Sequence, residues 1–195
     1  EEQDGSYVIT EVEERRNEVF RTTIREKKKK VIASNVDLLV IVSAVSEPVY
    51  KSGLVDRYLI RSEQWSIPTV LVFNKMDQYS EQNSPDLLYQ KLRCSSVVQH
   101  FYEVSCKDPE RKPEFLDAGL SELKDLLANK TAIFLGQSGV GKSKLISTLT
   151  DGKIQLESRE LGKVGKGAHT TTWAELIQSD VFRLIDSPGI RSFAI

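Results

Sequence analysis

The sequence predicts an α/β domain with a mostly parallel sheet flanked by helices, and three observations support this fold class. From Ser34 onward, short β-rich runs alternate with segments of helical periodicity, as in βαβ units. The apolar run VDLLVIVSAV, residues 36–45, has the length of a buried strand and is too short to cross a membrane. The 195 residues, 39% of them hydrophobic, suffice for one core plus an appendage.

Composition and cysteine usage narrow the class of protein. The formal net charge is −1, so the chain lacks an overall nucleic-acid-binding signature and any RNA contact must be local. Cys94 and Cys106 form no CxxC pair, which favours free thiols in a reducing compartment over a disulfide or zinc site. The chain starts with EEQDGS, without an initiator Met or a signal peptide, so we expect a fragment of a longer protein with no membrane span.

The first part of the chain, residues 1–33, has a different pattern from the rest. Residues 6–12 and 17–24 alternate roughly with period two around a polar EERR turn, which predicts a β-hairpin. Because a lone hairpin is marginally stable in water, we interpret it as the tail of a small β-barrel. The run REKKKK, residues 25–30, marks a boundary and is either a solvated linker or a patch for RNA phosphates.

The α/β domain, residues 34–195, contains the remaining elements. We expect strands over residues 36–42, 69–73, 101–105, 131–135, 173–177 and 181–185. Helices are predicted over residues 54–65, 84–93 and 119–130, the second with Ser84 as N-cap and Pro85 in its first turn. Residues 150–172 have neither periodicity, and a loop of that length in a compact domain is usually functional.

A phosphate-binding loop follows the predicted strand TAIFL. The segment GQSGVGKS matches GxxxxGKS in full and leads into the predicted helix KLISTLT. In this pattern backbone N–H groups and a helix N-terminus converge on an anion, Lys142 reaches the β- and γ-phosphates, and Ser143 ligates Mg²⁺. The residues expected to contact the nucleotide here are Gly136, Gln137, Ser138, Gly139, Val140, Gly141, Lys142, Ser143 and Lys144.

The tetrapeptide NKMD, residues 74–77, follows the strand TVLVF and predicts recognition of guanine. Asp77 can accept hydrogen bonds from the N1 and N2 hydrogens of guanine, a donor pair that adenine lacks. Asn74 and Lys75 would brace the loops and stack along the base, and Ser105, Cys106 and Lys107 would buttress it after the next strand. We therefore expect the ligands to be GTP and GDP. The alternative, an ATP-using P-loop kinase, would give these base-contacting residues no role.

The segment DSPG, residues 186–189, completes the nucleotide site. The run VFRLI places Asp186 at the carboxyl end of a strand, where its carboxylate can hold a Mg²⁺-bound water. Gly189 can offer its N–H to the γ-phosphate. Asp186 and Ser143 are therefore our predicted metal ligands.

These motifs occur in an unusual order, because the guanine motif precedes the phosphate loop. Ordinary GTP-binding domains start with the phosphate loop. If the helix GLSELKDLLANK leads directly into TAIFL, every element keeps its place in space, and such a permutation is physically cheap because domain termini often lie close together. The sequence therefore predicts a circularly permuted P-loop GTPase fold.

The sequence resembles the circularly permuted GTPases that act in late maturation of the small ribosomal subunit. The resemblance rests on SNVDLLVIVSAV, FNKMD, GQSGVGKSKLI, LGKVGKGAHTTT and DSPGIRSF and covers nearly the whole chain. Permuted GTPases that assemble the large subunit share the motif order but not the GAHTTT and SNVD segments. The resemblance implies an OB-fold barrel before residue 34, a zinc domain after the GTPase domain, and Thr171 as a further Mg²⁺ ligand.

The same resemblance implies the small ribosomal subunit and its rRNA as partners of a cytoplasmic or organellar monomer. Zinc is expected only in a domain outside this chain, since no Cys/His cluster follows Gly189.

Two positions bear on catalysis. Ile190 occupies the place where many GTPases keep a water-orienting glutamine, so intrinsic hydrolysis should be slow. His169 is the candidate replacement, and contact with RNA or shaping of its loop are the alternative roles. Two other functions remain open: a GTP-gated rRNA-binding checkpoint with negligible turnover, and a permuted GTPase of large-subunit assembly.

Overall fold

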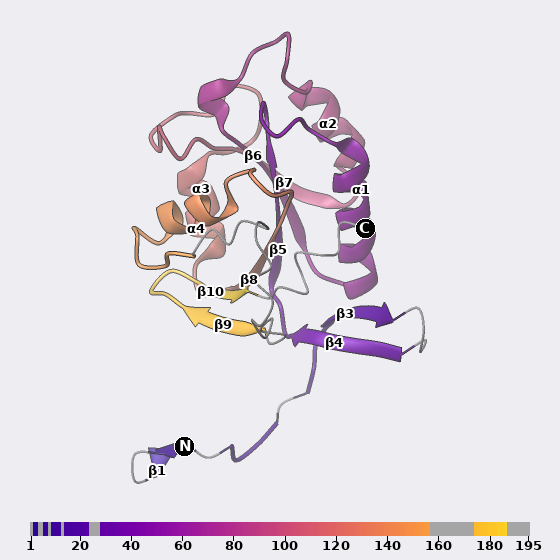
Figure 1. Cartoon of the computed structure of the whole chain (residues 1–195), viewed down its shortest axis with the longest axis vertical. Coiled ribbons are helices and arrows are strands. Elements are labelled where there is room, and N and C mark those ends of the chain that lie inside the picture. The colour runs from indigo at the N-terminus through magenta and orange to yellow at the C-terminus, as the bar shows by residue number, and fades with distance from the viewer. Residues whose placement is uncertain are drawn as a thin grey trace, which may run out of the picture.

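A six-stranded sheet forms the centre of the protein. The computed structural model describes residues 2–3, 6–7, 9–12, 14–23, 28–156 and 174–186. The strand order is β7-β6-β5-β8-β10-β9, and every neighbouring pair is parallel except β10 and β9 (Figure 1). The strands are β5 (Leu38–Ala44), β6 (Thr69–Asn74), β7 (Val98–Glu103), β8 (Thr131–Leu135), β9 (Glu175–Gln178) and β10 (Arg183–Asp186).

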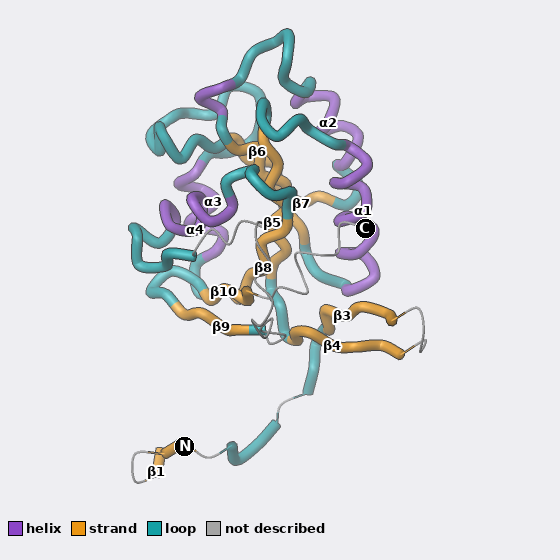
Figure 2. The backbone as a smooth tube through the Cα atoms, in the orientation of Figure 1, coloured by secondary structure: helices purple, strands orange, loops and turns teal. Residues whose placement is uncertain are grey.

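Helices cover both faces of this sheet (Figure 2). They are α1 (Ser52–Trp65), α2 (Leu87–Cys94), α3 (Leu120–Leu127) and α4 (Lys142–Leu149). Along β5, Leu39 and Ile41 pack in the cluster with α1 and α2, whereas Val40 and Val42 pack in the cluster with α3 and α4. Because both faces of β5 are buried, its sequence is an unbroken apolar run rather than an alternating one.

The connections create a switch point between β5 and β8. From β5 the chain adds β6 and then β7 in one direction, whereas β8 is followed on its other side by β10 and β9. Ligands of open α/β sheets bind at the carboxyl ends of the strands at such a point. Helix α3 leads into β8 through three residues, with Asn129 in a left-handed turn (φ 60°). The expected direct connection between that helix and the phosphate-loop strand is therefore confirmed.

Asp37 joins the two central strands at the opposite, amino edge of the sheet. Its backbone N–H donates to the Thr131 carbonyl at 2.8 Å, and its carboxylate accepts from the Thr131 N–H at 2.8 Å and from Arg16 at 2.9 Å. Burial alone would raise the pKa of the Asp37 carboxyl, but the hydrogen bonds from Thr131 and Arg16 outweigh it and lower the pKa below its ordinary value.

An antiparallel hairpin precedes the sheet, but its strands differ from the predicted ones. Strand β3 (Glu18–Thr23) pairs with β4 (Lys28–Ser34) rather than with residues 6–12, and β1 (Glu2–Gln3) pairs with β2 (Ser6–Tyr7). The linker interpretation was therefore wrong for residues 28–30, which are the first residues of β4. The domain boundary at residue 33 stays a prediction.

The hairpin packs directly on the helical layer. Val19 is fully buried in the cluster that contains α1, and the Trp65 indole N–H donates to the Phe20 carbonyl at 3.1 Å. A two-stranded ribbon is marginal by itself, so this contact supplies the apolar partner that it needs.

Some predicted boundaries were also wrong. Helix α2 is capped by Asp86, whose carboxylate accepts from the Tyr89 N–H at 2.9 Å, and not by Ser84, whose hydroxyl accepts from the Ser80 N–H. Strand β7 begins three residues before the predicted Phe101, because Val98 already pairs with Thr69. The cap is a local choice between two neighbouring capping residues, whereas the start of β7 depends on its pairing with β6.

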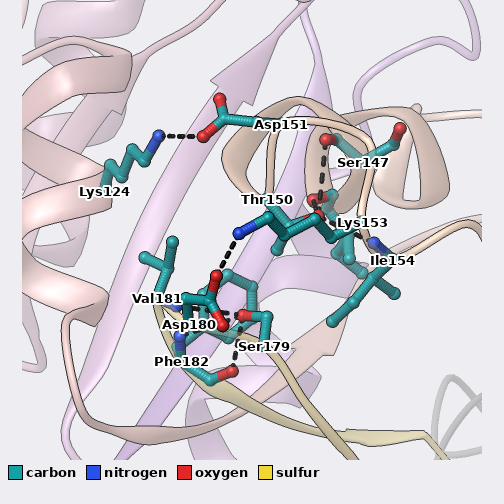
Figure 3. A network of polar contacts seen from close by, with 11 residues as sticks. Lys124, Ser147, Thr150, Asp151, Lys153, Ile154, Ser179, Asp180, Val181 and Phe182 are labelled. Atoms are coloured by element: carbon teal, nitrogen blue, oxygen red, sulfur yellow. Dashed lines mark hydrogen bonds and ion pairs between the residues drawn. The ribbon is translucent and has the colours of Figure 1, made fainter.

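A polar network holds residues 150–154, the start of the predicted long loop (Figure 3). The Thr150 hydroxyl donates to the Ile146 carbonyl and accepts from the Ile154 N–H, while Lys153 forms an ion pair with Asp180 in the β9–β10 turn. Ile154 is buried in the core beside α4. The first residues of that segment are therefore packed against the domain.

We predict that Asp37→Asn lowers the free energy of unfolding by roughly 1 kcal/mol at neutral pH, because the amide loses the charge-assisted bonds to Thr131 and Arg16. A carboxyl whose pKa is lowered on folding stabilises the protein above its unfolded pKa. The difference between parent and variant should therefore hold from pH 7 to 5 and shrink below about pH 4. Urea unfolding at pH 7, 5 and 3.5 measures it. Asp125→Asn, at an exposed position of α3, is the control, and a pH-independent difference would contradict the assignment.

Candidate guanine-nucleotide site

The phosphate loop leaves β8 at the switch point and turns where only glycine fits. Gly136 has φ 153°, and a Cβ there would lie 2.2 Å from the Val42 carbonyl oxygen of β5. Gly139 and Gly141 also have positive φ, at 84° and 94°. The spacing of these glycines allows the loop to pass against β5 and then enter α4 at Lys142.

Asn74 ties the guanine motif to this loop. Its side chain is 2% exposed, and its Nδ2 donates to the Val140 carbonyl at 2.9 Å. A Cβ on Gly141 would lie 2.5 Å from the same Nδ2. The end of β6 and the phosphate loop are therefore in direct contact, although they are 66 residues apart in the chain.

Lys142 lies across the phosphate loop. Its Nζ donates to the carbonyls of Gly136 and Gln137 at 2.7 and 2.9 Å, while its backbone begins α4. The loop therefore combines a fixed ammonium group with the N-terminus of a helix, an arrangement that attracts phosphate. Ser143 follows in the first turn of α4, and Lys144 is exposed.

Asp77 presents an ionised carboxylate beside these loops. The Ser105 hydroxyl donates to Oδ1 at 2.8 Å and Lys107 Nζ lies 3.2 Å from Oδ2. Burial by itself would raise the pKa of Asp77, but the bonds from Ser105 and Lys107 outweigh it and lower the pKa. The carboxylate is thus a pure acceptor at neutral pH, as recognition of the two guanine donors requires.

The SCK segment, residues 105–107, is held in place by the end of the strand before it, β7. Met76 N–H donates to the Val104 carbonyl and Val104 N–H donates to the Phe73 carbonyl, so β7 continues beside the guanine motif. The buried Ser105 hydroxyl also accepts from the N–H groups of Lys107 and Asp108. The predicted residues Ser105, Cys106 and Lys107 therefore lie next to Asn74 and Asp77.

One part of the site was missed from the sequence. The segment after β5, residues 46–50, lies against both motifs: Lys75 Nζ donates to the Glu47 carbonyl at 2.6 Å, and a Cβ on Gly139 would lie 3.6 Å from Pro48 Cδ. The Ser46 hydroxyl donates to Gln78. The sequence did contain a signal for this segment, because residues 46–50 follow the central parallel strand β5 and the segments after such strands lie at the carboxyl edge of the sheet.

The remaining predicted site residues divide into two groups. Asp186 ends β10, the parallel neighbour of β8, so it and Ser143 follow adjacent strands as expected. His169, Thr171, Gly189 and Ile190 lie outside the described residues. Within the described ranges no group of three or more His, Cys, Asp or Glu side chains could hold a metal ion, and no helix is long and apolar enough to cross a membrane.

The sheet is doubly wound, and the guanine motif is bonded to the phosphate loop through Asn74. Because the guanine motif precedes the phosphate loop in the chain, these features define the class of circularly permuted P-loop GTPase domains. The sequence model described as RsgA GTPase matches residues 12–195, and the chain belongs to the RsgA GTPase family. The resemblance inferred from the motifs is therefore confirmed.

Individual relatives agree with this assignment. The "Small ribosomal subunit biogenesis GTPase RsgA" of Chlorobaculum tepidum is 38% identical over 95% of this chain and 58% of its own length. The protein of that name from Flavobacterium psychrophilum is 31% identical over 96% of this chain and 56% of its own length. This chain thus spans little more than half the length of these curated relatives.

Solved structures share the fold. YjeQ from Thermotoga maritima superimposes with a TM-score of 0.68 at 29% identity, covering 98% of this chain and 58% of that one. YloQ, described as a circularly permuted GTPase, has a TM-score of 0.60 at 26% identity over 94% of this chain and 52% of its own.

We predict that Asp77→Asn weakens GDP binding about 10²-fold or more, because an amide cannot accept from both guanine donors as a carboxylate does. Its NH₂ group complements the carbonyl of xanthine instead, so XDP should become the preferred ligand. Titration calorimetry with GDP, XDP and ADP measures the change. Asp108→Asn, an exposed neighbour whose backbone rather than carboxylate contacts Ser105, should bind like the parent. Equal GDP and ADP affinity in the parent would contradict guanine selectivity.

Proposed function

We propose that this chain is the GTP-hydrolysing part of a factor for small ribosomal subunit assembly, with slow intrinsic turnover that the subunit stimulates. The observation that carries the proposal is the Asn74 bond to Val140, which joins a phosphate loop to a guanine-selective carboxylate. The names of the relatives support the small subunit as the partner, and we propose cytoplasmic or organellar action from that role.

The residues divide the chemistry of binding between them. The carboxylate of Asp77 reads the base, the backbone from Gly136 to Gly141 surrounds the phosphates, and the Lys142 ammonium stabilises the charge that develops on the transferred phosphoryl group. Lys75 braces the base loop through its bond to Glu47. These groups position GTP without covalent chemistry, as phosphoryl transfer requires.

The site fits Mg²⁺ bound with a nucleotide. Ser143 and Asp186 follow adjacent strands, and Thr171 is the third proposed ligand by family resemblance. A protein site for this ion usually offers one or two side chains and leaves other positions to water and phosphate, so a separate acidic cluster is not needed. When bound, Mg²⁺ neutralises charge on the β- and γ-phosphates.

Contact with rRNA is proposed for the basic segment before His169. Arg159, Lys163 and Lys166 suit RNA phosphates, and they lie outside the described residues. Lys153 lies in the same basic stretch of sequence, but it is paired with Asp180, so we do not include it among the proposed RNA contacts.

We predict that small subunits raise the GTP turnover of the natural full-length protein by roughly tenfold or more and that large subunits do not. The stimulation should fall as salt rises, because phosphate contacts release counterions. Multiple-turnover phosphate release measures it, and Lys142→Ala should remove turnover with either subunit. A rate unchanged by small subunits would support the alternative of a GTP-gated rRNA-binding checkpoint with negligible turnover.

We predict a separable effect for His169→Ala if this side chain positions the attacking water. GTP and GDP affinities should be nearly unchanged, while stimulated kcat at saturating subunits falls about 10²-fold, the usual scale for a lost positioning or acid–base group. Unstimulated turnover should hardly change. If His169 only shapes its loop, the mutant instead needs more subunit and reaches the parent plateau, and that result would remove it from catalysis.

A further inference from the structure

Cys106 contacts the residue that joins the two halves of the nucleotide site. It follows β7 in the SCK segment, and its Sγ lies 3.6 Å from Asn74 Oδ1, within hydrogen-bonding range for sulfur. The opposite end of the same amide, Nδ2, donates to the Val140 carbonyl at 2.9 Å. The side chain of Asn74 is therefore held at both ends, by a thiol on one side and by the phosphate loop on the other.

The Cys106 thiol is protonated at neutral pH and can therefore donate a hydrogen bond to Asn74. Burial raises the pKa of Cys106, so at neutral pH it is an S–H group that can donate to Oδ1. Thr148, in the helix that begins at Lys142, also interacts with the Cys106 side chain. One side chain thus touches the guanine motif and the phosphate-loop helix.

The orientation of the Asn74 amide matters because its two ends are chemically opposite. A rotation by about 180° would turn Oδ1 toward the Val140 carbonyl and leave two acceptors facing each other. Asn74 is 2% exposed, so water does not readily compensate. Within the described part of the chain, the Cys106 thiol is the side-chain donor to this oxygen.

We infer that Cys106 is a positioning residue for guanine nucleotide binding: its thiol fixes the Asn74 amide in the orientation that holds the phosphate loop beside the base loop. This inference rests on the proposed function, since it names a further determinant of the same site. Cys106 acts through Asn74 and is not a catalytic residue.

The test compares donor with non-donor side chains at position 106. Cys106→Ala removes the donor, whereas Cys106→Ser keeps a donor O–H group, which bonds to Oδ1 once the segment of residues 105–107 moves slightly closer to Asn74. We expect a fluorescent GDP analogue to dissociate about five- to tenfold faster from the alanine variant, and within about twofold of the parent rate from the serine variant. Stopped-flow displacement by excess GDP gives the rate, and thermal unfolding of nucleotide-free protein checks the fold.

Cys94→Ser is the matched control. Cys94 is a buried cysteine of the same domain that lies in α2, beside Arg93, and not in the nucleotide site, so the dissociation rate should equal that of the parent. If the alanine variant does not fold, Cys106→Val repeats the comparison without a donor and with an apolar side chain that is larger than cysteine and leaves no cavity.

The outcomes separate this inference from the proposed function. Equal rates for parent and Cys106→Ala would overturn the positioning role, as would a serine variant that releases the analogue as fast as alanine, since packing alone would then explain the effect. A parent that fails to bind GDP would overturn the proposed function and this inference with it.

Discussion

The hydrogen bond from Asn74 to the Val140 carbonyl holds together the two loops on which every other feature of the site depends. It forms because β6 and β8 lie on either side of β5 and end at the same edge of the sheet. The bond tolerates no side chain at Gly141, where a Cβ would lie 2.5 Å from Nδ2. The positions of Lys142, which starts the next helix, and of Asp77, three residues after Asn74, follow from this one contact.

The buried parallel sheet explains why a changed chain order leaves this contact intact. The four central strands, β6, β5, β8 and β10, contribute side chains to the clusters on both faces of the sheet. The place of each strand is therefore set by packing against its neighbours and the helices rather than by its position in the chain. The short connection from α3 through Asn129 to β8 joins the two elements that are the last and the first of an ordinary GTP-binding domain. Motifs separated in sequence therefore meet with the geometry that nucleotide binding needs.

The amino edge of the sheet serves a different purpose from the carboxyl edge. Asp37 joins β5 to β8 there, and Arg16 and Asn17 bring the segment before the hairpin into the same network. Trp65 then holds β3 against the helical layer. The hairpin is thus packed against the same domain as the candidate nucleotide site.

The sequence alone determined the fold class, the permuted order and the motifs that make up the candidate nucleotide site, because local patterns carry them. GxxxxGKS imposes its own backbone turn, NKMD follows a strand of apolar residues, and alternating strand and helix patterns predict a parallel sheet. The contact of residues 46–50 with Lys75 depended on a partner far away in the chain, whereas the hairpin pairing and the Asp86 cap are local contacts for which the sequence offered competing candidates. The tertiary structure decided between those candidates, and it also revealed the Lys75 and Cys106 contacts, because hydrogen bonds between distant residues leave no periodic signal in the sequence.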